Sequence, residues 1–319
     1  MTSTMNHWLR RAALVLATAL SAPAATAQSS ASCPPQPSAP SAQQVQAAQA
    51  QARDRGLLWR FSKDGRSHHL FGTIHVGKLE WAFPGPKLRA ALENAQAIAF
   101  ELDPADPSLL AGMRSSGAAT PRLPPALDAQ LQRQLARACL PVQALAGMHP
   151  MLQAITAMMV ESSRDGLHAA FGQEFVLAAA ARSRGLRSHS LESAERQMAA
   201  LIPADAALAE RHLAATLAQM DSGLARKVLL RLSAAWERGD LALIEGYEQW
   251  CECADSADER AMLKALNDER NPGMADRIAA LHQDGQRLLV AVGALHMTGA
   301  SALPALLRER GFTVERVAY

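Results

Sequence analysis

The sequence lacks an excess of charge of either sign and, beyond its first 27 residues, any long apolar run. Lys and Arg number 32 against 30 Asp and Glu, so the net charge is +2, and both signs are interspersed along the 319 residues. Nothing therefore indicates a nucleic-acid partner or a transmembrane segment. The sequence also lacks Gly-x-Ser-x-Gly, His-Glu-x-x-His and P-loop motifs, which removes support for the standard serine hydrolases, zincins and nucleotide-binding proteins.

The first 27 residues have the pattern of a secretory signal peptide. Arg10 and Arg11 precede the apolar run AALVLATAL, and ATA stands before Gln28. The run is too short to span a bilayer, and SSASC lacks the leucine three residues before Cys33 that a lipoprotein signal usually has. We expect cleavage after Ala27 and a periplasmic or secreted location.

The four cysteines are an even number in a chain expected to enter a compartment where disulfides persist. Cys33, Cys139, Cys251 and Cys253 allow three pairings, and the sequence does not choose among them. A bridge from Cys139 to the Cys251 and Cys253 pair would join two helical regions and is one open alternative. A zinc site on Cys-x-Cys is disfavoured, because no second thiol pair completes the four ligands of a structural zinc.

Composition and periodicity divide the remaining chain into a spacer and one domain. Residues 28–55 are expected to be a disordered spacer, because Ser, Ala, Pro and Gln dominate there without periodicity. Residues 56–319 begin with an expected hairpin around Asp64-Gly65, a strong two-residue turn signal. Apolar residues at helical spacing dominate residues 104–284. The predicted fold is α/β: a mixed β-sheet core with repeated strand–Gly-x-x-His–helix–strand units and a large helical middle region.

One pattern occurs near both ends of this domain. HHLFGTIHVG and LLVAVGALHMTG each run an apolar strand into Gly-x-x-His and then into a predicted helix and strand. Glycine permits a tight departure from a strand, and the carboxyl end of a strand is where an α/β sheet places its chemistry. We therefore single out Gly72 with His75 and Gly293 with His296. The bare pattern also occurs in the hairpin turn, ending at His68, where it is assigned no role.

A longer set of segments has a recognisable counterpart. LFGTIHVG, AFELD, GQEFVLAAAARSRG, SLESAERQ, LNDERNPGMADRI and the terminal LLVAVGALHMTGASALPALLRERGFTVERV occur in this order and resemble the TraB/PrgY/GumN family, to which the animal Tiki proteases belong. The resemblance covers Gly56 to Tyr319. Two Gly-x-x-His motifs and a characteristic glutamate define that family, and in Tiki proteins they are taken to form a divalent-metal-dependent hydrolase site. Carried over residue by residue, the resemblance implies a site of Gly72, His75, Glu101, Gly293 and His296.

The chemistry of His75, Glu101 and His296 agrees with that implication. Two neutral imidazoles and one or two carboxylates suit Zn²⁺, Mn²⁺ or Co²⁺, and a bound metal makes its water a nucleophile near neutral pH. Glu101 stands in the apolar strand AIAFELD, where an unpartnered carboxylate is costly to bury, so metal ligation or a general-base role would explain it. The alternative is that strand alternation turns Glu101 to solvent and that both histidines are structural.

Four further residues are expected to support the site. Glu192 matches the family's Leu-Glu position and is a candidate metal ligand or a carboxylate that orients a histidine, with a helix N-terminal charge as the alternative. Arg270 and Asn271 match the family's Arg-Asn pair: Arg270 is expected to hold a carboxylate bidentately, unless Asn271 merely stops a helix before Pro272. Glu174 falls where many relatives carry Asp, which leaves its role open.

These interpretations lead to one expected function and two alternatives. We expect an exported hydrolase that depends on a divalent metal, with a peptide or another small molecule as its substrate. The first alternative is a binding or regulatory protein on the same scaffold. The second is a hydrolase that uses the same histidines without metal, with histidine as the general base for a water, as in the erythromycin-esterase-like relatives. Analogy at the level of the fold does not identify the substrate.

Overall fold

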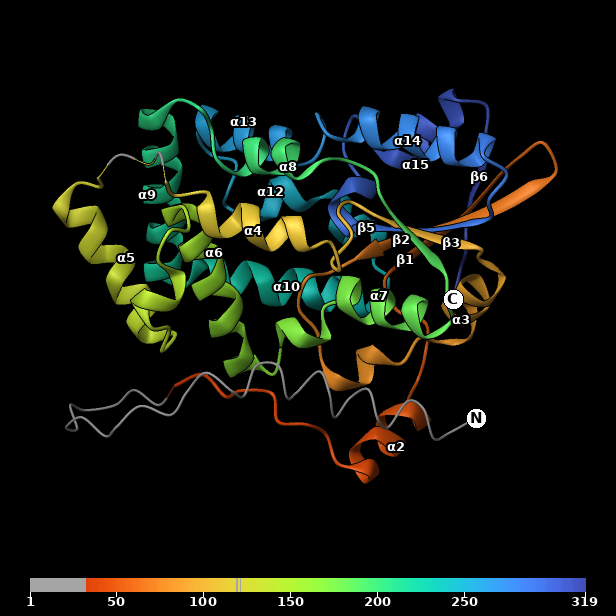
Figure 1. The fold of residues 1–319 in the computed structure, drawn as a ribbon, viewed down its shortest axis with the longest axis horizontal. Coiled ribbons are helices and arrows are strands. Elements are labelled where there is room, and N and C mark those ends of the chain that lie inside the picture. Colours follow the sequence, from red (N-terminus) through yellow and green to blue (C-terminus); the bar gives the residue numbers. More distant parts are fainter. Residues whose placement is uncertain (1–32, 119, 121) are drawn as a thin grey trace.

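The computed structural model describes residues 33–118, 120 and 122–319 (Figure 1). The signal peptide expected over residues 1–27 lies outside these residues. Six strands form one sheet in the order β4-β3-β5-β2-β1-β6. Their bounds are β1 Leu57–Lys63, β2 Arg66–Thr73, β3 Ala97–Phe100, β4 Arg187–Ser190, β5 Leu288–Gly293 and β6 Thr313–Arg316. In this sheet β1 alone runs against the other strands, since it pairs antiparallel with both β2 and β6 while β2, β5, β3 and β4 are parallel.

The first two strands form the hairpin that the sequence predicts. Asp64 and Gly65 form its two-residue turn and have positive φ angles of 51° and 72°, which suits the Asp-Gly turn type that matches strand twist. The register pairs Lys63 with Arg66 next to the turn and Leu57 with Gly72 at the open end. The hairpin therefore delivers Gly72 and the residues after it to the open edge of the sheet.

The two predicted strand–Gly-x-x-His–helix–strand units are both present. In the first, β2 leads through α3 (Pro86–Asn94) to β3, which lies one strand away beyond β5. In the second, β5 leads through α15 (Leu303–Glu309) to β6, which lies beyond β2 and β1. Because the flanking strands of each unit are parallel, both units are crossover connections, and their Gly-x-x-His turns leave the same edge of the sheet.

Helices cover both faces of the sheet and make up the middle of the chain, which confirms the predicted α/β fold (Figure 1). Helices α14 and α15 lie on one side of the sheet, and α7 and α3 lie on the other. The remaining helical region extends away from the carboxyl ends of the parallel strands. The bounds of the helices not yet given are α4 Pro107–Ser115, α5 Pro125–Arg137, α6 Pro150–Glu161, α7 Gln173–Ser183, α8 Ala194–Leu201, α9 Ala206–Ser222, α10 Leu224–Arg238, α11 Leu241–Glu245, α12 Tyr247–Trp250, α13 Ala257–Leu266 and α14 Asn271–Gln283, with short 3₁₀ turns η1 Leu79–Ala82, η2 Val142–Leu145, η3 Ser162–Asp165, η4 Ala169–Phe171 and η5 Ala294–Met297.

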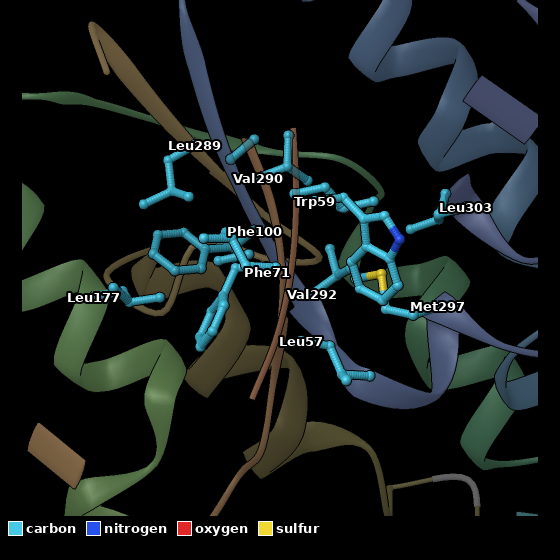
Figure 2. Close-up of a cluster of buried hydrophobic side chains, with 14 of the residues drawn as sticks. Leu57, Trp59, Phe71, Phe100, Leu177, Leu289, Val290, Val292, Met297 and Leu303 are labelled. Carbon is cyan, nitrogen blue, oxygen red and sulfur yellow. The ribbon is translucent and has the colours of Figure 1, made fainter. Parts of the chain in front are cut away.

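Two hydrophobic clusters hold the fold together. In the larger one, Phe100 and Leu177 pack on one face of the sheet, while Trp59 and Leu303 pack on the other (Figure 2). Burying a side chain of this size stabilises a fold by about 1.5–3 kcal/mol relative to leaving it exposed. The smaller cluster joins α5, α6 and α9 through residues such as Leu135, and gives the helical region a core of its own.

The expected disordered spacer contains a helix, which corrects that expectation. Helix α2 (Ala42–Ala50) begins at Ser41, whose hydroxyl accepts a hydrogen bond from the Gln44 backbone while the Gln44 side chain accepts from the Ser41 backbone. This reciprocal cap satisfies two backbone donors of the first turn. Val45 and Ala48 are buried, and the helix lies against η1. A local cap and two small apolar contacts thus order a segment whose composition indicates disorder.

The structure also selects one disulfide pairing. Cys33 pairs with Cys139, and Cys251 pairs with Cys253, so the suggested bridge from Cys139 to the Cys251 and Cys253 pair is wrong. The two-residue separation of the second bridge is accommodated by Glu252, which lies between its cysteines with a φ of 53°. Within the described ranges, no helix is both long and apolar enough to cross a membrane.

Candidate functional site

The predicted site residues meet at the carboxyl edge of the parallel strands. His75 follows β2, Glu101 follows β3 directly, Glu192 follows β4, and His296 lies in the 3₁₀ turn after β5. Thr73 of β2 is paired with Gly293 of β5, so the two Gly-x-x-His turns leave neighbouring strands side by side. The strand order thus brings together residues that lie far apart in the sequence.

His75 forms an ion pair with Glu174 at the exposed side of the site. The Nδ1 atom of His75 lies 3.0 Å from Oε1 of Glu174, and the His75 side chain is 67% exposed while that of Glu174 is 16% exposed. Thr73 also donates its hydroxyl hydrogen to Glu174. The Glu174 carboxylate raises the pKa of His75 to about 9. The imidazole is therefore protonated at neutral pH, and its Nε2 remains available for a ligand.

Glu174 is held in place by the backbone that precedes it. The N–H of Gln173, the first residue of α7, donates to the carbonyl of Ile74 at 2.9 Å. A Cβ on Gly172 would lie 2.4 Å from the carbonyl oxygen of His75, so only glycine fits between these segments. The start of α7 is thus locked against the first Gly-x-x-His turn, which fixes the carboxylate beside the imidazole.

Glu101 is a largely buried carboxylate, which excludes the solvent-facing alternative. Its Oε1 accepts a hydrogen bond from the Gly293 N–H at 2.7 Å, and its Oε2 accepts from Gln197 at 3.1 Å and from the Arg270 guanidinium. Burial alone would raise the pKa of Glu101, but His296 and Arg270 favour the ionised carboxylate and hold the pKa well below its ordinary value. A Cβ at Gly293 would come within 3.2 Å of Oε1, so glycine also leaves room for this carboxylate.

Arg270 joins Glu101 to Glu192 under the site. Its Nε lies 3.1 Å from each oxygen of Glu192, and its Nη2 bonds to both Glu192 and Glu101. The Arg270 and Glu192 side chains are only 7% and 2% exposed. The expected bidentate contact between Arg270 and a carboxylate is therefore present, and a helix-end role does not account for Glu192.

His296 is buried, and Asn271 fixes its tautomer. The Asn271 amide nitrogen donates to the carbonyl oxygens of His296 at 3.3 Å and Ser301 at 2.8 Å, which leaves its Oδ1 to face Nδ1 of His296 at 2.7 Å. Nδ1 must then carry a hydrogen, so in the neutral ring Nε2 is the acceptor. Nε2 lies 3.4 Å from both Oε1 of Glu101 and Nη1 of Arg270. Asn271 is thus a positioning residue for His296.

The divalent metal implied by the resemblance does not fit the donors in this arrangement. Both oxygens of Glu101 and both of Glu192 already accept hydrogen bonds, and Arg270 lies between the two carboxylates. The Nδ1 atom of His75 faces Glu174, and Nε2 of His296 faces Arg270. Among the residues that the structure describes, no group of three or more His, Cys, Asp or Glu has the geometry of a metal site.

Three further residues complete the arrangement. Gln197 follows Glu192 by a little over one helical turn, and Gly172 stands at a helix start, so both have a local signal in the sequence. Thr73, inside the first motif, was missed, and its position next to Gly72 is the signal that could have found it. Gly72 itself has a packing role, because a Cβ there would lie 3.1 Å from Cα of Ala294, in the turn that follows β5.

Comparisons with known proteins identify two relatives and a family. Two curated relatives, each named "Uncharacterized protein YbaP", come from Escherichia coli (strain K12) and Shigella flexneri. Each is 27% identical over 253 residues, which cover 76% of this chain and 88% of the relative. No solved structure matches. The model of the TraB/PrgY/gumN family matches residues 57–316, and the chain belongs to that family.

Proposed function

We propose that this protein is a hydrolase whose site is the carboxyl edge of the sheet. The observation that carries the proposal is the exposed imidazole of His75, which is paired with the partly buried Glu174 and interacts electrostatically with the ionised Glu101. Ionisable groups with strongly shifted pKa values, gathered at the strand ends of an α/β sheet, are typical of catalytic sites.

His75 is the proton donor in this proposal. Its Nδ1–H bonds to Glu174, and its Nε2–H donates to the oxygen of the substrate that gains negative charge or leaves during hydrolysis. The Thr73 hydroxyl and the Gln173 backbone contact keep the Glu174 carboxylate in place. Glu101 and Arg270 lie deeper in the site and act on His75 electrostatically, Glu101 raising its pKa and Arg270 lowering it.

The substrate class and location in this proposal rest on less direct support. Family membership and the Tiki resemblance favour a carbonyl compound such as a peptide or an ester. Export is supported by the Cys33–Cys139 and Cys251–Cys253 disulfides, because such bonds persist in oxidising compartments. Divalent-metal dependence, as implied by the resemblance, would require Arg270 to withdraw from the carboxylates.

The test is turnover by the chain purified with both disulfides formed. Fluorogenic peptide and chromogenic ester panels are assayed in chelator and then with Mn²⁺, Co²⁺ or Zn²⁺. His75→Gln is expected to lower kcat/KM by about 100-fold or more, the usual contribution of a positioned proton donor. His69→Gln, a change on the same strand before the motif, is the matched control and should retain activity.

Two results would contradict the proposal. Equal loss in both variants would show that the change acts on folding and not on chemistry. A folded parent with no turnover on any panel, but with saturable binding of a ligand that His75→Gln weakens, would identify a binding protein on a hydrolase scaffold.

A further inference from the structure

We infer that the Arg270 guanidinium occupies the position of a divalent cation in this site and serves as its permanent positive charge. The inference goes beyond the proposed hydrolase function, because it concerns what holds two buried carboxylates together whether or not the site is catalytic. Glu101 and Glu192 are 11% and 2% exposed, and both lie against Arg270. Two ionised carboxylates that are buried side by side repel each other and have lost their hydration, so a cation between them is needed to stabilise both.

Every N–H group of the Arg270 side chain is used. The Nε–H donates to both oxygens of Glu192, and the two Nη2 hydrogens serve Glu192 and Glu101. The two Nη1 hydrogens face the carbonyl oxygen of Leu266, at 2.8 Å, and Nε2 of His296, at 3.4 Å. A guanidinium has five donors in a fixed planar arrangement, and here all five have partners. Arg270 is thus a built part of the site and not a mobile counter-ion.

The same contacts engage the atoms that a metal would need. A divalent ion bound by Glu101, Glu192 and His296 requires a carboxylate oxygen from each glutamate and the unprotonated ring nitrogen of the imidazole. In this site the guanidinium lies against one oxygen of Glu101, both oxygens of Glu192 and Nε2 of His296. Because Nδ1 of His296 faces Asn271, Nε2 is the ring nitrogen that faces the guanidinium. One planar cation therefore satisfies groups that would otherwise form a metal site.

The position of Arg270 is also fixed by its place at the start of a helix and by a bond to a backbone carbonyl. It is the residue that precedes the first turn of α14, and its neighbour Asn271 is fully buried. Its bond to the carbonyl of Leu266 ties it to the end of α13. Shortening this side chain would leave the carboxylates and the imidazole uncompensated around a vacated space. The inference therefore makes an unusual prediction: removal of Arg270 creates a metal site that the parent lacks.

The experiment measures metal binding directly, so it does not depend on any substrate. The parent, Arg270→Ala and the control Arg55→Ala are titrated with Zn²⁺, Mn²⁺ and Co²⁺ by calorimetry and by thermal unfolding. Arg55 is a buried arginine that pairs with Glu237 and backbone carbonyls outside the site. Arg270→Ala is expected to bind one ion per chain, with a Kd at least ten times lower than that of any binding by the parent or by Arg55→Ala. Its unfolding midpoint should rise by about 5 °C at a hundredfold excess over Kd.

Loss of the buried guanidinium is expected to destabilise the chain. Arg270→Gln, which keeps more bulk, replaces Arg270→Ala if the alanine variant does not fold. Glu101→Gln in the same background should abolish the gained binding. The inference is overturned if the parent itself binds an ion that Glu101→Gln removes, or if a folded Arg270 variant binds no ion. Neither outcome bears on turnover, so the hydrolase proposal and this inference fail separately.

Discussion

Acid is expected to destabilise the fold through one buried histidine at the opposite edge of the sheet from the site. His68 is fully buried on β2, stacked on Phe61 with ring centroids 4.8 Å apart. Its Nδ1 accepts from the Leu288 N–H at 3.1 Å, so its Nε2–H donates to Nδ1 of His282 at 3.0 Å. Burial first, and then the neighbouring His282, lower the pKa of His68 to about 3.

The sign and size of the effect follow from proton linkage. The folded state keeps His68 neutral down to about pH 3, whereas the unfolded chain protonates it below its ordinary value of 6.5. The unfolded state therefore binds more protons between these pH values, and stability falls as the pH falls. The full contribution of neutral His68 to the free energy of unfolding is present above pH 6.5. At 1.36 kcal/mol per pKa unit, about 2 kcal/mol is lost by pH 5 and about 3 kcal/mol by pH 4.

Urea unfolding between pH 4 and pH 8 measures this loss. With a slope of about 3 kcal/mol per molar urea, the midpoint should fall by about 0.7 M between pH 7 and pH 5 from His68 alone. In His68→Asn the amide oxygen can still accept from Leu288, but the side chain does not titrate. This variant should be less stable than the parent at pH 8 and should lose stability less steeply as the pH falls, because the contribution of His68 is gone. His189→Asn, which changes a half-buried histidine bonded to Gln286, should keep the slope of the parent. A His68→Asn variant with the same pH dependence as the parent would refute the reasoning.

Three further predictions concern the site and the N-terminal bridge. Turnover should decline as the pH rises through about 9, because His75 loses its proton at the pKa that Glu174 gives it. Glu174→Gln should move this decline to lower pH. A pH profile that does not move would show that His75 is not the titrating donor. Gly172→Ala should cost about 1–3 kcal/mol of stability, because its Cβ would meet a backbone oxygen at 2.4 Å. Gly273→Ala, which has open space around its Cβ, is the control and should be neutral or stabilising. Equal effects of the two changes in urea unfolding would argue against the close approach. Cys139→Ser should cost about 4 kcal/mol in the same assay by opening a bridge across 106 residues, and a loss below about 1 kcal/mol would mean that the N-terminal segment adds little.

Local signals in the sequence were sufficient for much of the fold and part of the site. The Asp64-Gly65 turn predicts the hairpin because few residues adopt two successive positive φ angles. The repeated pattern places His75 and His296 after parallel strands, and such strands end at one edge of a sheet. Glu101 stood out because a carboxylate in an apolar strand requires a partner.

The partners themselves could not be read from the sequence. Arg270 is 169 residues from Glu101 and 78 from Glu192, and such long-range contacts leave no mark in local periodicity. The pairing of His75 with Glu174 depends in the same way on how α7 begins against β2. These contacts decide whether the cluster holds a metal or a guanidinium, and so the expected metal site depended on information that only the fold supplies.

The place of β5 in the sheet has a consequence for how the protein matures. This strand lies between β3 and β2, yet it is made from residues 288–293, near the end of the chain. Until those residues emerge from the ribosome, the β1–β2 hairpin and the β3–β4 pair have no neighbour to join them, and their edges stay open. A nascent chain therefore cannot join its sheet until late in its synthesis. His296 follows directly behind the strand that joins these two pairs, so the candidate site is assembled when the sheet is joined.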